Sequence, residues 1–417
     1  MSELQPASHT RVLNAAVIVA ALGYFVDIYD LLLFGIVRTA SLNDLGITGQ
    51  ANRDQGEFLL SMQMYGMLLG GIVWGVLGDR RGRLSVLFGS IVTYSIANIA
   101  NGMVTSVEAY AVWRLVAGFG LAGELGAGIT LVAETLPKEK RGYGTMIVAS
   151  VGVSGAVAAN LIYQTLQDWR MCYYAGGILG MLLLLLQVSV SESGMFKNMA
   201  DTSTTKGNFL ALFTNRGRLL KYLQCILIGI PLWFLVGVLI TFAPEFAKAL
   251  GVQEPEAIMA GKAIAWCYAG LVFGDIFTGL LSQVLKSRKK VMFTFLSLNL
   301  IMVFVYLNTH GLSTTAFYLL CLGMGFSVGY WVIFVTIAAE QFGTNIRATV
   351  TTTVPNFVRG ALPITLLIYQ YFRNTVFDGD IIKAGMVVGF ILSAISLSAL
   401  WGLKETFSED LNYTENI

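Results

Sequence analysis

Twelve apolar stretches, each long enough to cross a lipid bilayer, constrain the fold of this chain more than any other feature. A helix needs about 20 consecutive apolar residues to span the hydrocarbon core of a membrane. Stretches of this kind lie at residues 12–37, 56–78, 84–104, 107–133, 143–166, 171–191, 221–247, 258–285, 291–308, 313–339, 349–372 and 384–403. Each is predicted to be a transmembrane helix, so the sequence indicates an all-α membrane protein.

The composition agrees with this interpretation and excludes several other classes of protein. Of the 417 residues, 55% are hydrophobic and 12% are charged, whereas soluble proteins carry about 25% charged residues. A net charge of +2 gives no basis for a nucleic-acid partner. The four cysteines form no C-x-x-C pair, so we expect no metal site and no cofactor. The chain has neither a phosphate-binding loop nor a nucleophile–histidine pair, so an enzyme is not expected.

A polar segment and a repeated signature divide the chain into two related units. We predict an N-terminal six-helix bundle at 1–191, a cytoplasmic linker at 192–220 and a C-terminal six-helix bundle at 221–417. The segment AETLPKEKRG at 133–142 has an altered copy, AEQFGTNIRA, at 339–348. A repeat offset of about half the chain is typical of transporters built from two pseudo-symmetric bundles.

The distribution of positive charge predicts the orientation of the spans. With the N-terminus inside, 18 of the 27 Lys and Arg residues fall on the inner side and 7 on the outer side. The remaining two, Arg114 and Arg359, lie within the membrane. Because inner loops carry the excess of Lys and Arg, we expect both termini to be cytoplasmic. We expect the protein in the cell membrane, as a multi-pass protein of a bacterial inner membrane.

Three motifs resemble those of the major facilitator superfamily of transporters. The loop GVLGDRRGR at 75–83 resembles the G-x-L-x-D-R-x-G-R signature, and RLVAGFGLAGE at 114–124 resembles R-x-x-x-G-x-G-x-x-G. The third motif is E-x-x-P-x-x-x-R-G at 134–142. The segment VDIYDLLLFG at 26–35 is also similar to the first span of metabolite:proton symporters and sugar porters. The resemblance implies twelve helices around a central cavity, with spans one and four side by side.

Four charged residues at membrane depth are candidates for proton coupling. Asp27 and Asp30 lie three residues apart, so a helix places them on one face, where two nearby carboxylates resist joint ionisation. Arg114 is expected at the depth of Asp30, and we predict that protonation of Asp30 releases Arg114. The alternatives are a static Asp30–Arg114 pair and an Asp27 capped by a neighbouring hydroxyl. Glu124 is either a deeper proton station or a packing carboxylate.

A second group of residues is predicted to shape the substrate site. Asp275 and Arg359 lie at similar depth, either as a structural ion pair or with Arg359 facing the cavity to receive a carboxylate. The remaining candidates are aromatic and amide residues on other spans, and each has packing as its alternative role. These candidates are Trp233, Tyr330, Trp331, Asn160, Gln164 and Asn356.

The repeated signatures predict a gate at the inner side. Charged groups at helix ends and between neighbouring helices can together bias a two-state closure, although basic residues alone could serve only orientation. The predicted gating residues are Gly75, Asp79, Arg80, Arg83, Glu134, Arg141, Glu340 and Arg347. The equivalent second-half loop has Gln283 where the first half has Asp79, so we expect the two latches to differ.

These patterns predict a proton-coupled secondary transporter that imports a small polar, anionic metabolite by alternating access. The alternative within transport is a drug or metabolite exporter that exchanges against protons. A membrane sensor is a further alternative, but no cytoplasmic domain to transmit a signal is apparent. The expected partners are a small-molecule substrate, protons and the bilayer, and a monomer is expected because each pair of bundles encloses its own pathway.

Overall fold

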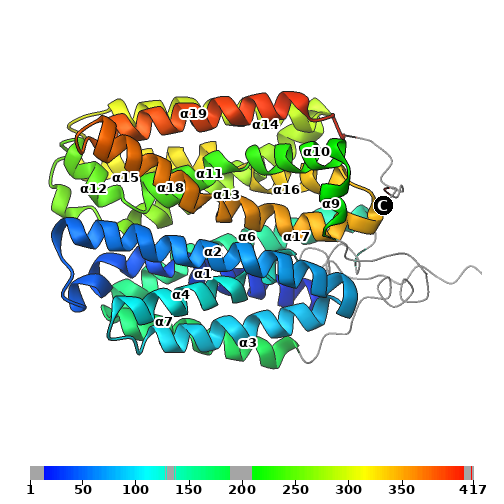
Figure 1. The fold of residues 1–417 in the computed structure, drawn as a ribbon, viewed down its shortest axis with the longest axis horizontal. Helices are drawn as coiled ribbons and strands as arrows, with labels where there is room; N and C mark the ends of the chain where they lie inside the picture. The colour runs from blue at the N-terminus through cyan, green and yellow to red at the C-terminus, as the bar shows by residue number, and fades with distance from the viewer. Residues whose placement is uncertain are drawn as a thin grey trace, which may run out of the picture.

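The computed structural model describes residues 14–126, 128, 136, 138–187, 209–407 and 415, and every regular element among them is a helix (Figure 1). The first half contains six long helices: α1 (Ala15–Asp44), α2 (Gly49–Arg81), α3 (Arg83–Asn101), α4 (Val107–Leu121), α6 (Lys138–Leu166) and α7 (Trp169–Gln187). They form one bundle, drawn in blue to green in the lower half of Figure 1.

The second half forms the other bundle, in which three of the predicted spans are broken into shorter pieces. Its unbroken long helices are α13 (Ala260–Leu285), α14 (Arg288–Asn308) and α19 (Ile381–Gly402). The broken spans are α10 (Arg216–Leu227), α11 (Ile230–Phe234) and the π-helix η1 (Leu235–Ile240); α15 (Thr314–Ser327) and α16 (Trp331–Glu340); and α17 (Thr344–Gly360), α18 (Leu362–Tyr371) and the π-helix η3 (Phe372–Val376). Short helices α9 (Ala211–Thr214), α12 (Ala243–Ala249) and η2 (Pro255–Ala257) complete the bundle.

Proline explains two of these breaks. Pro231 and Pro363 occupy the first turns of α11 and α18, where a missing backbone N–H is tolerated but the preceding helix cannot continue regularly. The third break, at Val328–Tyr330, follows a glycine-rich run that contains Gly323 and Gly325. The described helices of the first half contain no proline.

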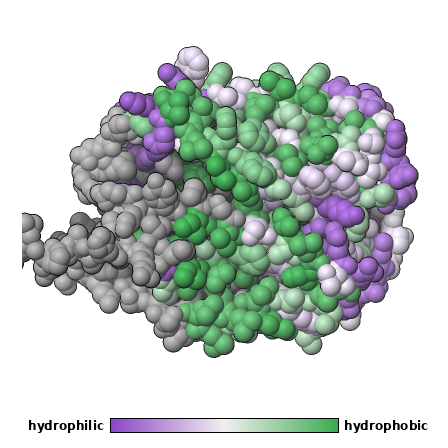
Figure 2. Space-filling model, turned by 180° about the vertical axis from the view of Figure 1, so that it is seen from behind, coloured by the Kyte–Doolittle hydropathy of each residue, from purple (hydrophilic) through white to green (hydrophobic). Residues whose placement is uncertain are grey.

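The surface and the helix lengths are those of a multi-pass membrane protein. Nine of the described helical segments are long and apolar enough to cross a bilayer. The other three predicted spans correspond to α4, with 15 residues, to α6, whose apolar part is Val151–Leu166, and to α17, with 17 residues. Figure 2 shows apolar atoms across the middle of the molecule and hydrophilic residues gathered at one end. An exposed apolar belt of this extent requires a lipid surrounding.

The two bundles repeat one close helix crossing. In the first bundle a Cβ added to Gly118 of α4 would collide with the carbonyl of Gln63 on α2, and one on Gly66 with the carbonyl of Leu115. In the second bundle, a Cβ on Gly325 of α15 would collide with the carbonyl of Cys267 on α13, and one on Gly270 with that of Leu322. These glycines allow the helix backbones to come into contact. Corresponding glycines of the two crossings are separated along the sequence by nearly the same number of residues as the two copies of the signature.

The bundles meet along two seams, between α2 and α17 and between α6 and α13. At the first seam, Asn356 of α17 donates to the carbonyl of Ala122 at 2.8 Å. At the second, Gly261 of α13 would place a Cβ 2.6 Å from Asn160 Oδ1 on α6. The limits predicted at 191 and 221 stay predictions, since residues 188–208 lie outside the described part.

Candidate functional site

An ion pair between the two bundles lies at the centre of the structure. Arg359 Nη2, on α17, is 3.8 Å from Asp27 Oδ2, on α1. Both side chains are almost completely buried, with 1% and 0% exposure. The separation exceeds hydrogen-bond length, and neither Asp27 oxygen has a hydrogen-bond partner among the described residues. The sequence did not predict this pair: Asp27 was expected on one helix face with Asp30, and Arg359 either paired with Asp275 or facing the cavity.

Aromatic side chains surround the guanidinium of Arg359. Its Cζ lies 5.7 Å from the ring centre of Trp233 and 5.6 Å from that of Trp331, at cation–π distance. These three residues, with Tyr24 and Tyr268, line a cavity of about 20 Å³. A cavity of that size holds about one water molecule, so the centre is closed in this state.

The predicted Asp30–Arg114 pair is not formed. Arg114 Nη2 donates instead to Gln63 Oε1 on α2, and its Cζ lies 4.7 Å from the ring centre of Phe34. Asp30 packs against Gly176 of α7, where an added Cβ would meet its carboxylate, and Asn98 lies beside it.

The geometry of α1 explains this difference. Residues three apart on a helix are separated by about 60° around its axis. Since α1 is surrounded on nearly all sides, with 83% of its apolar window buried, that angle is enough to point Asp27 toward the second bundle and Asp30 into the first. The two carboxylates are close in angle around the axis of α1, but their neighbours differ.

Glu124 and Asp275 are both buried away from Arg359. The Glu124 Oε1 atom contacts Gly23 of α1, one turn from Asp27, and Oε2 has no hydrogen-bond partner among the described residues. Asp275 Oδ1 accepts a hydrogen bond from the backbone N–H of Val332 at 3.2 Å. The interpretation of Asp275 and Arg359 as a structural pair is therefore wrong.

The remaining predicted substrate residues do not line the central cavity. Asn356 also donates to Thr352 O at 2.9 Å, so its amide group is used at the seam between the bundles. Asn160 is buried under Gly261, and Gln164 is half-buried further along α6. Tyr330 is fully buried at the break between α15 and α16. Of the predicted set, only Trp233, Trp331 and Arg359 surround the cavity.

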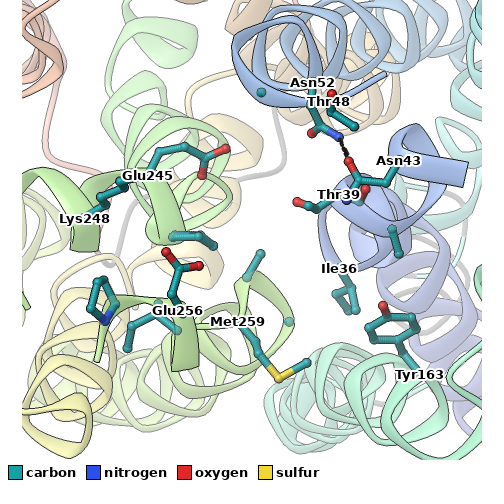
Figure 3. A pocket seen from close by; sticks show the side chains of 17 residues that line it. Ile36, Thr39, Asn43, Thr48, Asn52, Tyr163, Glu245, Lys248, Glu256 and Met259 are labelled. Atoms are coloured by element: carbon teal, nitrogen blue, oxygen red, sulfur yellow. Dashed lines mark hydrogen bonds between the residues drawn. The ribbon is translucent and has the colours of Figure 1, made fainter. Parts of the chain in front are cut away.

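A larger pocket opens at the opposite end of the molecule from the second signature, and we call this end the outer end, after the predicted orientation. The outer pocket has a volume of about 580 Å³ and lies between the bundles (Figure 3). Glu245, Lys248 and Glu256 line it from the second bundle, and Thr39 and Asn43 from the first (Figure 3). A polar, open pocket in this place is suited to be the entry to the closed centre.

Two buried arginines join the bundles at the outer end through ion pairs that the sequence did not indicate, and Arg373 also lies 3.2 Å from Asp54 Oδ1 on α2. Arg38 Nη2 contacts Glu245 Oε1 at 2.6 Å, and Arg373 Nη1 contacts Glu57 Oε1 at the same distance. Both arginines are buried, with 1% and 2% exposure of their side chains. From the sequence, both arginines contributed only to the charge on the outer side. A sequence signal for such pairs does exist: an arginine at the end of an apolar span, with a glutamate at the same end of another span.

The inner gate is described only in its second half. Glu134 and the side chains of Asp79, Arg83 and Arg141 lie outside the described residues; Arg80 is exposed, and an added Cβ on Gly75 would lie 3.4 Å from Thr353. Glu340 Oε1 lies 3.4 Å from Arg288 Nη2. The side chain of Arg347 donates to the carbonyls of Ala339 and Phe342 at 3.0 and 3.2 Å.

A carboxylate from the C-terminal segment completes this second latch. Glu405 accepts hydrogen bonds from the backbone N–H groups of Arg288 and Lys289, at 2.8 and 3.2 Å, at the start of α14. Gln283, which replaces the first-half aspartate, is exposed. In this second latch an acid from another segment binds the helix N-terminus, and the expected difference from the first latch stays a prediction.

Glu57→Gln combined with Glu245→Gln is expected to shift the molecule toward a state open at the outer end. Glu245→Gln leaves the buried Arg38 without its anion, and Glu57→Gln leaves Arg373 with only the half-exposed Asp54. Breaking a fully buried pair such as Arg373–Glu57 costs about 3–5 kcal/mol, and the partly exposed Arg38–Glu245 pair contributes less. Distances between spin labels at exposed positions 108 and 383, on opposite bundles, should lengthen. The matched control is Asp44→Asn, which removes an ion pair to Arg170 within one bundle at the same end. An unchanged distance distribution in the double variant would show that these pairs do not hold the outer end closed.

The comparisons with known proteins agree with the fold. The Major Facilitator Superfamily matches residues 20–365. A putative metabolite transport protein of Haemophilus influenzae is 30% identical over 200 residues, which cover 46% of this chain and 47% of that protein. The sialic acid transporter NanX of Escherichia coli is 24% identical over 276 residues, 65% of either chain. The chain thus spans about half to two-thirds of the length of these relatives.

A solved structure of the proton:xylose symporter XylE bound to 6-bromo-6-deoxy-D-glucose is similar to the whole chain. The TM-score is 0.70 at 16% sequence identity, and the similarity covers 95% of this chain and 97% of the other. At this identity the likeness shows the fold alone. Together with the match over most of the sequence, it confirms the all-α fold, the resemblance drawn from the three motifs and the expectation of a protein that is not an enzyme. The chain belongs to the Major Facilitator Superfamily.

Proposed function

We propose that this protein imports a small organic anion together with protons, and that Asp27 and Arg359 couple the two. The observation that carries the proposal is the buried 3.8 Å ion pair between the bundles. An ion pair without hydrogen bonds, inside a low-dielectric core, is costly to maintain. Its two charges are therefore available to a substrate anion and to a proton.

The exchange of partners would link substrate and proton. A carboxylate that reaches Arg359 from the outer pocket offers a closer, two-pronged acceptor than Asp27 does. Once Arg359 binds the substrate, Asp27 is a buried carboxylate without its cation, and desolvation favours its protonated form. One anion and one proton then enter without a change in buried charge. After the cavity reopens inside, departure of the substrate returns Arg359 to Asp27, which expels the proton.

The other buried acids give this proton a route. We place its entry at Asp30, which lies one turn from Asp27 toward the outer end of α1, and its exit near Glu124, which contacts α1 one turn on the inner side of Asp27. Arg114 would then hold α4 to α2 through Gln63 and influence Asp30 from a distance. This assignment replaces the Asp30–Arg114 switch expected from the sequence.

The names of related proteins support the proposal without deciding the substrate. The sialic acid transporter is named for an anion that bears a carboxylate, and the structural neighbour is a proton symporter. We further propose a cell-membrane location with both termini cytoplasmic, and function as a monomer, because Asp27 and Arg359 of one chain complete the coupling site.

Proteoliposomes that contain a pH-sensitive dye test the proposal. They would be challenged with a panel of organic acids, amino acids and sugars in the absence of an imposed pH gradient. We expect internal acidification on addition of one class of anion. Loss of internal protons during anion movement would instead indicate the exporter that exchanges against protons. Binding without any proton movement would contradict proton coupling.

A further inference from the structure

The surroundings of Arg359 narrow the class of anion, and this inference rests on the proposed function. We infer that the substrate is a planar aromatic monocarboxylate, bound with its carboxylate on Arg359 and its ring against Trp233 and Trp331. The juxtaposition that suggests it is a guanidinium with unused donors beside two indole rings in one buried cavity.

The guanidinium of Arg359 has N–H donors that are available to a substrate. Its Nε and Nη1 atoms have no hydrogen-bond partner within the described part of the chain, and its Nη2 atom is only within ion-pair distance of Asp27. A guanidinium carries five N–H donors that bind carboxylates in a planar fork. Leaving them unmatched in a buried site is unfavourable, so the site is complete only when an oxyanion occupies it.

The second interior arginine is not available for a second carboxylate. Arg114 is hydrogen-bonded to Gln63, lies over Phe34, and does not line the cavity. Among the residues that do line it in the described structure, Arg359 is the one cation. A dicarboxylate would therefore leave one of its charges buried without a partner, which is strongly unfavourable. The site fits a single carboxylate.

The side chains that line the cavity favour a substrate with an aromatic ring over one with several hydroxyl groups. Trp233, Trp331, Tyr24 and Tyr268 supply aromatic faces, and the other lining residues are aliphatic apart from Arg359. A sugar needs several amide or carboxylate partners, but the nearby Asn356 already donates to two carbonyls at the seam. Aromatic rings gain about 0.5–1.5 kcal/mol per favourable ring contact beyond the area that they bury.

The closed state also explains how such a ring enters. The cavity of about 20 Å³ is too small for a six-membered ring, so the bundles must part before binding. Trp233, Trp331 and Arg359 belong to the second bundle, and Tyr24 and Asp27 belong to the first. Separation would therefore leave the indole–guanidinium group intact on one bundle and open the slot on the side that Tyr24 and Asp27 now cover.

A matched set of ligands tests this inference on the unaltered protein. Benzoate, cyclohexanecarboxylate and benzamide have similar size, but the second lacks a planar ring and the third lacks the charge. Calorimetric titration of protein in lipid nanodiscs should give benzoate an affinity at least about tenfold above that of cyclohexanecarboxylate, as expected for two aromatic contacts. Benzamide should bind at least about tenfold more weakly than benzoate, because it cannot form the ion pair.

Two variants test whether the indole ring of Trp331 causes the preference for benzoate over cyclohexanecarboxylate. Trp331→Leu should reduce the preference for benzoate over cyclohexanecarboxylate to about its square root, about threefold for a tenfold preference, since one of two aromatic contacts is lost, and Trp331→Phe should largely restore it. Equal affinity of the unaltered protein for both acids would overturn the inference and leave the import of organic anions standing. Transport of aliphatic acids alone would also overturn it. Binding of sugars or cations with no anion bound would overturn the proposed function itself.

Discussion

Asp27→Asn is expected to abolish proton-driven accumulation of the substrate while substrate exchange across the membrane continues. The asparagine has the shape of aspartate but cannot exchange a proton, so Arg359 still receives the anion and no proton accompanies it. For one proton per anion, each unit of pH gradient supports about a tenfold concentration ratio. In proteoliposomes with an imposed gradient, accumulation should therefore fall to the level of simple equilibration, whereas counterflow of labelled substrate persists.

Asp275→Asn provides the matched control for this result. Asp275 is also a buried aspartate of a membrane span, but its carboxylate bonds the backbone of Val332 rather than Arg359. Its substitution should leave the ratio of protons to substrate unchanged. Arg359→Ala should in contrast remove both exchange and accumulation, because the anion loses its cation. If Asp27→Asn retained full accumulation against the gradient, the exchange of partners at Arg359 would be the wrong mechanism.

Gly270→Ala is expected to prevent correct assembly of the second bundle. The new Cβ would collide with the backbone carbonyl of Leu322, which cannot move without displacing α15. Overpacking of this kind costs about 1–3 kcal/mol or more. The yield of monodisperse protein in detergent and its thermal midpoint should both fall sharply.

Gly279→Ala, on the same helix, is the control for this prediction. No atom lies within 4 Å of a Cβ at that position, so the substitution should be neutral or slightly stabilising, by up to about 1 kcal/mol. Equal loss of stability in both variants would mean that helix propensity or lipid contact, and not the crossing of α13 with α15, determines the effect.

The sequence predicted the helices for a physical reason, but it did not predict the close crossings. Helices in lipid must satisfy their own backbone groups, so apolar length alone identifies them. Gly118 stands out because a recognisable motif surrounds it. Its second-half equivalent, Gly325, lies outside any of the three motifs, and its contact with Cys267 appears only when the two helices are placed together.

The candidate site could be predicted only in part. The rarity of charges at membrane depth singled out Asp27 and Arg359 as site candidates, but the ion pair that the structure shows joins residues from opposite halves of the chain. Helical spacing gives the direction of a side chain around its own axis and says nothing about which neighbouring helix lies there. For that reason Asp30 was expected to pair with Arg114, whereas in the structure its carboxylate lies against Gly176.

The interruptions near Pro231 and Pro363 in the second bundle have a mechanical consequence. The two longest helices of the first bundle, α1 and α2, run for 30 and 33 residues without interruption, so each acts as a stiff lever that carries a displacement from one membrane surface to the other. In the second bundle the interruptions near Pro231 and Pro363 act as pivots, at which one half of a span can tilt while the other stays still. A force applied at the outer end would thus be carried across the membrane by α1 and α2 and be absorbed locally in the second bundle, close to Trp233 and Arg359.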